Sequence, residues 1–257
     1  MRTTNITNAD GIEHLTALTK LDLANKKIPK IDVSKNTALL DLNLSNTSIS
    51  EINLSKNTAL TTLNLERNEL RSLDVTANTA LKVLYAGTNN LLTLDVTKNT
   101  ELTHLYSNAN YLTALDVSKN TKLETLYTGF NQLTSLNIST NGALKTLYVN
   151  DNALTELVVG TKAELGAIYA QNNKLASLTI TSAPKMTTLY VHNDTTTQTN
   201  KNAITTLNIR DTNIANGGNG LRIHNNGTIN LLCKKGFDYT SEDFHKLGNI
   251  LSVTPAP

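Results

Sequence analysis

The stretch LETLYTGFNQL, residues 123–133, decides the fold because its pattern returns along the chain at a fixed interval. Its first leucine is one of nine aliphatic residues that recur every 21 positions: Leu18, Leu39, Leu60, Leu81, Leu102, Leu123, Leu144, Leu165 and Met186. A period of this length is typical of stacked supersecondary units, each of which contacts only its neighbours. The sequence therefore predicts an elongated repeat solenoid instead of a globule.

Each 21-residue unit contains two half-repeats of about ten residues, too short to hold a strand, a turn and a helix. Half A reads Leu-x-x-Leu-x-(aliphatic or small)-x-x-Asn-x-Leu, and half B reads Leu-x-x-Leu-Asp-Val-(Ser/Thr)-x-Asn. Both are leucine-rich repeats with a central segment that alternates inward and outward residues, which indicates a strand. We expect a mainly β solenoid with two parallel sheets, one strand per half-repeat, and Leu126, Thr128, Leu115 and Val117 pointing inward. Strands on both sides would stack about 4.8 Å apart, so neither side would be wider than the other. The solenoid should therefore be only gently curved.

An asparagine closes each half-repeat. These residues are Asn68, Asn89, Asn110, Asn131, Asn152 and Asn173 in half A, and Asn36, Asn57, Asn78, Asn99, Asn120 and Asn141 in half B. An asparagine amide can satisfy backbone groups that a tight turn would otherwise bury unpaired. We therefore expect structural ladders, not binding residues.

The repeat pattern divides the chain into three regions. Residues 1–17 should form an N-terminal cap with a short helical turn, and residues 18–232 the solenoid, with an eight-residue polar insertion near 194–202. Residues 233–257 should form a C-terminal cap with a helix over 239–247, followed by the start of a linker. Both ends need covering because an open sheet edge recruits other chains.

Composition excludes several classes of function. The net charge is +2 with 17% charged residues, so neither nucleic acid nor an anionic membrane is an expected partner. No apolar run is long enough to cross a bilayer, and no signal peptide is present. The Thr-Pro-Ala-Pro ending favours a fragment excised from a longer protein. Cys233 is the only cysteine, so no internal disulfide can form.

The outward position of half A carries tyrosine in six consecutive repeats: Tyr85, Tyr106, Tyr127, Tyr148, Tyr169 and Tyr190. Tyrosine is a residue that protein interfaces favour. Tyrosines in register can equally stack and stabilise the sheet, and the two interpretations are compatible. Varied outward residues flank this row, as a recognition surface requires: His104, Phe130, Asp151, Gln171 and His192. Phe130 beside the tyrosines would make an apolar patch, or it can equally lie over a neighbouring coil.

Signals for metal binding and catalysis are weak. Asp74, Asp95 and Asp116 lie on adjacent half-B segments and could bind calcium, but neighbouring hydroxyls, turn amides and lysines can satisfy them. The histidines share no metal-ligand spacing, and no catalytic motif occurs. Cys233 lies beside two lysines that could lower its pKa, although a buried capping thiol is the stronger interpretation. The sequence predicts no enzyme, no cofactor and no metal site.

Residues 116–127, DVSKNTKLETLY, resemble the repeats of bacterial surface leucine-rich-repeat proteins, including the internalin subgroup with a cysteine in every repeat. Residues 10–23 are similar to an internalin first repeat. The cysteine position is occupied here by Leu23, Leu44, Leu65, Ala86, Ser107, Thr128, Val149, Ala170 and Val191. Roles that depend on that cysteine ladder therefore do not carry over.

The resemblance implies a secreted or cell-surface module that contacts a host or neighbouring cell. We expect a monomeric, non-enzymatic binding or adhesion module that recognises a protein or glycan through the half-A face centred on Tyr106, Tyr127 and Tyr148. The alternative is a structural spacer or stalk with no ligand of its own. The outward residues of half A vary from repeat to repeat, whereas those of half B are nearly constant. This difference favours binding over a spacer role.

Overall fold

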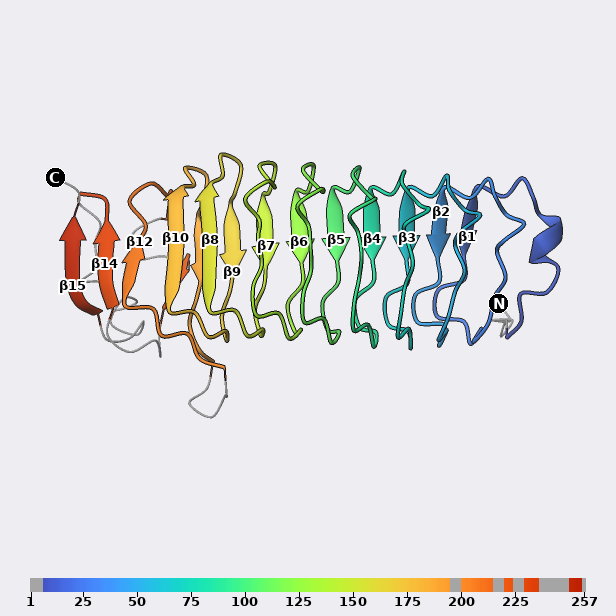
Figure 1. Ribbon diagram of the computed structural model, residues 1–257, viewed down its shortest axis with the longest axis horizontal. Coiled ribbons are helices and arrows are strands. Elements are labelled where there is room, and N and C mark those ends of the chain that lie inside the picture. The colour runs from blue at the N-terminus through green and yellow to red at the C-terminus, as the bar shows by residue number, and fades with distance from the viewer. Residues whose placement is uncertain (1–6, 195–199, 215–219, 224–228, 236–249, 256–257) are drawn as a thin grey trace, which may run out of the picture. The chain divides into compact units, whose positions relative to one another are not determined.

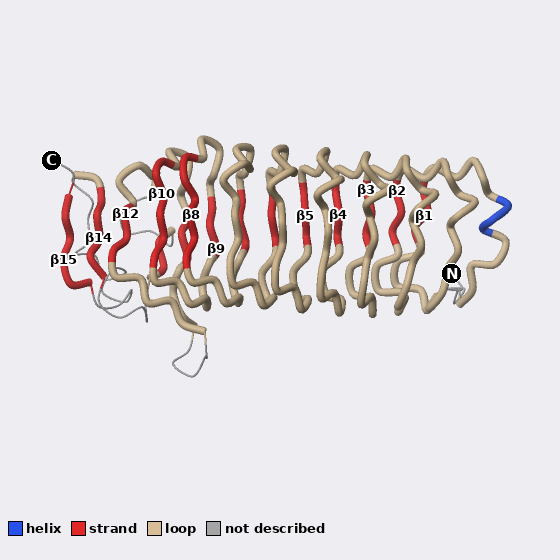
Figure 2. The backbone as a smooth tube through the Cα atoms, in the orientation of Figure 1, coloured by secondary structure: helices blue, strands red, loops and turns tan. Residues whose placement is uncertain are grey.

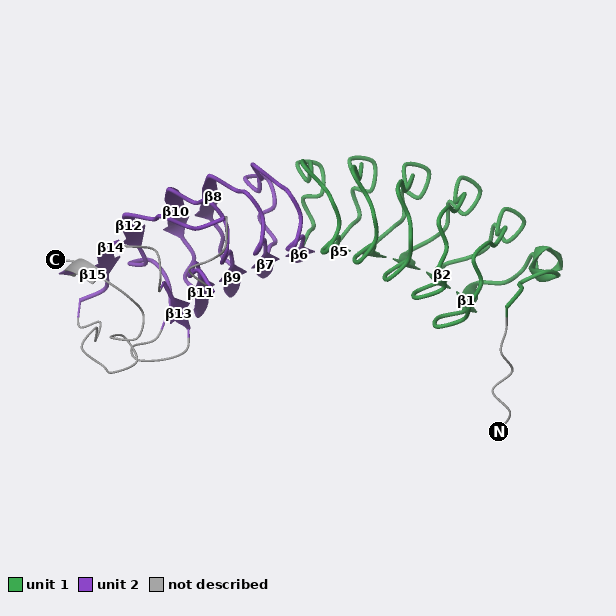
Figure 3. Ribbon diagram, turned by 90° about the horizontal axis from the view of Figure 1, so that it is seen from below, with its two compact units in different colours: residues 1–123 green, residues 124–257 purple. Residues whose placement is uncertain are grey.

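The computed structural model describes residues 7–194, 200–214, 220–223, 229–235 and 250–255. Within them the chain winds as parallel coils with almost no helix, which confirms the predicted mainly β repeat solenoid (Figure 1). It divides into two compact units, residues 1–123 and 124–257, which are described separately (Figure 3). Among these residues, no helix is long and apolar enough to cross a membrane.

In unit 1 the half-A strands form one parallel sheet. They are β1 (Lys20–Asp22), β2 (Asp41–Asn43), β3 (Thr62–Asn64), β4 (Val83–Tyr85) and β5 (His104–Tyr106). The strands pair in chain order without a slip, so that Leu63 lies beside Leu42 and Leu84. Because every coil has the same length, the central leucine of each strand points inward and its neighbours point outward.

Unit 2 carries strands on both sides. On the half-A side are β6 (Thr125–Tyr127), β7 (Thr146–Tyr148), β9 (Ala167–Tyr169), β11 (Thr188–Tyr190) and β13 (Leu221–Arg222). On the half-B side β8 (Glu156–Thr161) pairs with β10 (Ser177–Ser182), and β12 (Thr206–Asn208), β14 (Ile229–Cys233) and β15 (Ile250–Pro255) form a further parallel set. Figures 2 and 3 show these two sets on opposite sides of unit 2.

The expectation of one strand in every half-repeat is wrong for the coils that precede β8. Their half-B segments keep the alternation, with Leu73 and Val75 buried and Asp74 exposed, but no strand forms between residues 26 and 141 on this side. A short polar side chain makes the same local turn in each of these segments. The Oδ1 atom of Asp74 accepts a hydrogen bond from the Thr76 N–H at 2.9 Å, and equivalent turns occur at Asp32, Asn53, Asp95, Asp116 and Asn137.

Such local bonds can compete with a β-ladder. Val158, at the same position in β8, has no side-chain acceptor, and the chain continues there as a six-residue strand. The turn does not by itself exclude a strand, because Asn208 makes the same bond to the Arg210 N–H at 3.1 Å within β12.

The inward anchors were predicted correctly. Leu126, Thr128 and Val117 are fully buried and Leu115 is buried. The asparagine ladders are also confirmed: the Asn152 Nδ2 atom donates to the carbonyls of Thr128, Val149 and Asn150 at 3.0, 3.2 and 3.3 Å, and its Oδ1 atom accepts from the Leu133 N–H at 2.9 Å. In the half-B ladder the Asn99 Nδ2 atom likewise donates to two carbonyls, those of Val75 and Asn78, at 2.9 and 2.8 Å. Its Oδ1 atom, in contrast to that of Asn152, is buried without a hydrogen-bond partner.

The half-A ladder resumes after the insertion at Asn202. Its Nδ2 atom donates to the Ala170 and Val191 carbonyls, both at 2.9 Å, and its Oδ1 atom accepts from the Leu175 N–H at 3.0 Å. Asn193 closes the base of the insertion through reciprocal bonds with Asn202, at 2.8 and 3.1 Å. The inserted residues are therefore accommodated without losing a step of the ladder.

Lys162 takes the place of asparagine in the half-B ladder. Its side chain is 2% exposed, and its Nζ atom donates to the Ser139 carbonyl at 3.4 Å. Burial lowers the pKa of Lys162 below its ordinary value of 10.5 because it penalises the charged form. A long single bond is poor compensation for a buried ammonium group.

Replacing Lys162 with asparagine should raise the free energy of unfolding by about 1–3 kcal/mol, because the amide can again serve two carbonyls of the preceding coil. The unfolded chain binds the lysine proton more tightly, so wild-type stability should rise with pH between the lowered pKa and 10.5. Denaturation curves from neutral pH to pH 10.5 measure this rise. It should be smaller in Lys162→Asn and unchanged in Lys174→Asn, where the lysine is exposed. Equal slopes in all three proteins would contradict the assignment.

Among the described residues, the predicted helical turn at the N-terminus is a three-residue 3₁₀ helix, Ile12–His14. It buries none of its side chains, so a helical cap over the first coil is not shown. The Asn36 Nδ2 atom donates to the Ile12 and Leu15 carbonyls at 2.8 and 2.9 Å, which are the ladder bonds that Asn57 makes one coil later. The ladder thus holds this segment as a half-B turn, which leaves too few free residues for a helix.

At the other end, the predicted helix over residues 239–247 lies outside the described residues. Residues 250–255, where a linker start was expected, form β15 and pair with β14. The predicted gentle curvature stays a prediction.

Candidate functional site

The tyrosines stack in both units, as the structural interpretation predicted. In unit 1 the rings of Tyr85 and Tyr106 are 4.6 Å apart and nearly parallel, at 12°. Burial, and secondarily the neighbouring Tyr85, raises the pKa of Tyr106. In unit 2 the centroid distances along the row Tyr127, Tyr148, Tyr169 and Tyr190 are 4.6, 4.2 and 5.1 Å. The Tyr148 and Tyr169 rings are parallel, at 2°, and cover each other's faces. Tyr127 is tilted by 43° to Tyr148, and Tyr190 meets Tyr169 edge to face, at 83°.

A second column of residues lies beside the tyrosines in a left-handed backbone conformation. Its members, with φ between 52° and 59°, are Asn25, Asn46, Arg67, Thr88, Ala109, Phe130, Asp151 and Asn172. Asparagine and aspartate adopt this conformation at low cost, whereas bulky or β-branched side chains such as Arg67, Thr88 and Phe130 adopt it at a higher backbone cost. Phe130 is nonetheless here, with φ of 56° and 52% exposure. Phe130 was predicted as one of several outward residues beside the tyrosines, but the column itself was not predicted, although its members recur every 21 residues.

Asp151 belongs to a polar network in unit 2. Its carboxylate accepts hydrogen bonds from the amides of Asn150 and Asn172 at 2.8 and 2.9 Å. The Asn172 amide also donates to Asp194 at 2.6 Å, and Asp194 contacts the His192 Nε2 atom at 2.9 Å. These bonds hold Asp151 and Asp194 in fixed positions beside the tyrosine row.

The remaining predicted contact residues differ in accessibility. His192 is only 4% exposed, so it orients Asp194 instead of offering a contact surface as expected. Gln171 is half-buried. In unit 1, His104 is half-buried, shares a 2.9 Å hydrogen bond with the Thr103 hydroxyl and stacks near Tyr106.

The described ends of the insertion lie against the left-handed column of unit 2. The Asp194 N–H donates to the Asn172 Oδ1 atom at 2.9 Å, and the Asn200 amide donates to the Asn152 carbonyl at 2.6 Å. At the end of the tyrosine row, the Arg222 guanidinium lies 4.5 Å from the centre of the Tyr190 ring.

The half-B carboxylates are engaged in their own turns. The hydroxyl and the N–H of Thr76 lower the pKa of Asp74, and Thr97 acts in the same way on Asp95. For Asp116 the pKa is lowered by the Ser118 N–H and hydroxyl. Within the described residues, these aspartates join no group of three potential metal ligands.

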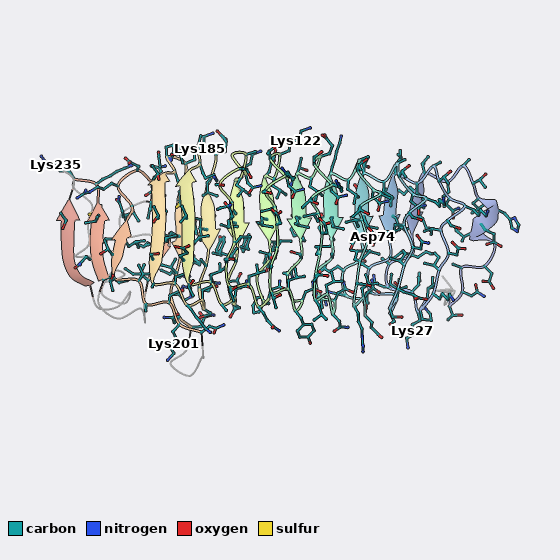
Figure 4. All side chains as sticks on the ribbon, viewed as in Figure 1. Lys27, Asp74, Lys122, Lys185, Lys201 and Lys235 are labelled. Atoms are coloured by element: carbon teal, nitrogen blue, oxygen red, sulfur yellow. The ribbon has the colours of Figure 1, made fainter. Side chains whose placement is uncertain are left out.

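Charged side chains also link successive coils at their turns. Lys122 pairs with Glu101 at 2.6 Å and Lys185 pairs with Glu164 at 2.7 Å, and both lysines project from turns in Figure 4. Cys233 is buried, and burial raises the pKa of its thiol, only partly opposed by Arg210. The suggestion that neighbouring lysines lower this pKa is therefore wrong.

The half-B side holds surface grooves that were not predicted from the sequence. Four cavities of 290–380 Å³ lie between neighbouring half-B segments. The volume of each groove depends on the distance between adjacent backbone segments, and this distance cannot be predicted from any single residue.

Comparison with known proteins agrees with the fold. No family profile and no curated protein matches the chain. Among solved structures, the functional domain of InlJ from Listeria monocytogenes, which includes a cysteine ladder, has a TM-score of 0.51 at 22% identity, covering 90% of this chain and 66% of that one. A leucine-rich-repeat protein of Leptospira interrogans has a TM-score of 0.59 at 22% sequence identity, and the match covers 79% of this chain and 57% of that one. The APL1 leucine-rich repeat domain has a TM-score of 0.64 at 18% identity, and the match covers 100% of this chain and 66% of that one.

The coil geometry and these likenesses define a leucine-rich-repeat protein, a class whose usual role is binding. Structural neighbours include bacterial internalins, so the internalin-like resemblance fits at the level of the fold. The chain spans no more than about two thirds of the three structures compared above. Where a cysteine ladder would lie, this chain buries other residues, among them Ala86, Thr128 and Val149.

Proposed function

We propose that this chain is an adhesion module that binds a protein partner at or outside the surface of a bacterial cell. The proposed contact surface is the unit 2 face, defined as Tyr127, Tyr148, Tyr169 and Tyr190 with Phe130, Asp151 and Gln171. Support comes from the binding role usual for the fold and from the internalin-type neighbours.

Phe130 is the observation that carries the proposal. Its left-handed backbone conformation is unfavourable for a bulky residue, and its half-exposed ring gains little from burial. Asn46 and Asn172 occupy the same position at lower backbone cost. A residue that fits neither the backbone nor the core is explained by a contact outside the chain.

The stacked Tyr148 and Tyr169 rings in the middle of the row favour a protein over a glycan on this surface. Sugar rings bind aromatic faces, whereas the 4.2 Å stacking of Tyr148 on Tyr169 leaves ring edges. Beside them, Phe130 offers an apolar contact and the fixed carboxylate of Asp151 an acceptor. A partner segment that presents an apolar side chain next to a basic one would match this pair.

A structural spacer is the second candidate. The stacking of neighbouring tyrosines stabilises the sheet without any ligand, so the tyrosine row alone does not separate the two functions. Phe130 does separate them, because a spacer gains nothing from an exposed phenylalanine on an unfavourable backbone.

Replacing Phe130 with asparagine should therefore stabilise the fold by about 1 kcal/mol and weaken partner binding by about 30-fold or more. Stability is measured by chemical denaturation, and binding on an array of purified animal and bacterial extracellular proteins. Leu92→Asn, at a residue 62% exposed in unit 1, is the matched control and should change neither quantity. If no arrayed protein binds, or if every binder tolerates Phe130→Asn, the spacer function is favoured instead.

A further inference from the structure

One half-B groove of unit 2 has a lining suited to a small polar ligand. It lies between the segment 135–139 and β8 and has a volume of about 310 Å³. Its lining residues are Ser135, Leu136, Asn137, Ser139, Glu156 and Val158. This volume is at the lower end of the range for small-molecule sites, roughly 300–1,000 Å³.

The groove combines hydrogen-bond acceptors, donors and an apolar wall. Glu156 is exposed and joins no ion pair among the described residues. The Asn137 Oδ1 atom accepts from the Ser139 N–H at 3.0 Å, which directs the acceptor inward to the turn and leaves the amide NH₂ as a donor. Val158 is 53% exposed at a position where preceding coils carry aspartate or asparagine.

The same groove recurs in unit 1, five repeats earlier, with a volume of about 380 Å³. Its lining residues are Lys30, Ile31, Asp32, Ser34, Glu51, Ile52 and Asn53. Glu51 and Glu156 occupy equivalent positions, and the intervening and following repeats have Ser72, Thr93, Ala114, Ser135 and Ser177 there. Glutamate thus stands at this position in two repeats, and in both it lines a groove.

We propose that the Glu156 groove binds one sugar unit of a neutral glycan. The Glu156 carboxylate accepts hydrogen bonds from sugar hydroxyls, and the Asn137 amide donates to another. Val158 and Leu136 contact the apolar C–H face of the ring. A simple cation would use the carboxylate alone and leave the amide donor and the apolar wall without a role. The Glu51 groove is a second site of the same kind, modified by Lys30 and Asn53.

The test is methyl NMR of the whole chain titrated separately with N-acetylglucosamine, galactose, mannose and methylammonium. At least one sugar should shift the Val158 methyl signals in a saturable way. Glu156→Ala and Asn137→Ala should each weaken that binding by about tenfold or more. Glu164→Ala, which removes an exposed glutamate elsewhere in unit 2, should leave it unchanged.

Val158→Asp provides a variant that should keep strand β8, because strand β12 carries the short polar residue Asn208 at the same position. It places a second carboxylate in the groove and should abolish sugar binding. If no sugar shifts Val158, or if only methylammonium does, the proposal is overturned. Phe130→Asn should bind sugar normally, so the failure of the protein-binding function and the failure of this site are distinguishable.

Discussion

Replacing Asn152 with alanine is expected to lower the free energy of unfolding by about 3–5 kcal/mol. The amide serves the carbonyls of Thr128 and Val149 and accepts from the Leu133 N–H, all buried. Alanine would leave these backbone groups without partners in a site that water does not reach, and each unsatisfied group costs about 1–3 kcal/mol. Denaturant titration followed by circular dichroism measures the loss.

Asn53→Ala is the matched control for this ladder prediction. Asn53 is exposed and its side chain accepts a single hydrogen bond, from the Ser55 N–H at 3.0 Å. Water can replace that bond, so the loss should stay below about 1 kcal/mol. Similar losses in the two variants would show that the buried ladder is not a principal source of stability.

Truncation of Leu126 to alanine should cost about 2–5 kcal/mol. Leu126 is fully buried at the centre of β6 and pairs in register with Leu147. Removing it leaves a cavity that short strands locked by the ladders cannot close. Because coils contact only their neighbours, hydrogen exchange should accelerate most in the adjacent coils.

Leu92→Ala, which truncates an exposed leucine, controls for the chemical change and should alter stability by less than about 0.5 kcal/mol. An equal cost at both positions, or exchange that accelerates uniformly along the chain, would contradict the nearest-neighbour description.

The candidate site was only partly predictable. Tyrosine stacking follows from the period, because residues 21 positions apart must lie on neighbouring strands. The burial of His192 does not follow, because it depends on the insertion bringing Asp194 against Asn172. The left-handed backbone conformation of Phe130 could not be predicted either, because phenylalanine rarely adopts a positive φ.

The sequence by itself determined the repeat length, the register and the inward residues such as Leu126 and Val117, because one constant period assigns each position to the core or the surface. It also identified the asparagines that close the coils. Only the tertiary structure decided where half B becomes a true sheet, since the same local turn occurs at Asp116, where no strand forms, and at Asn208, which lies in β12. Pairing therefore depends on the approach of the neighbouring coil. It also decided which asparagine resumes the ladder after the insertion and where grooves open, because both depend on distances between backbones that are far apart in sequence.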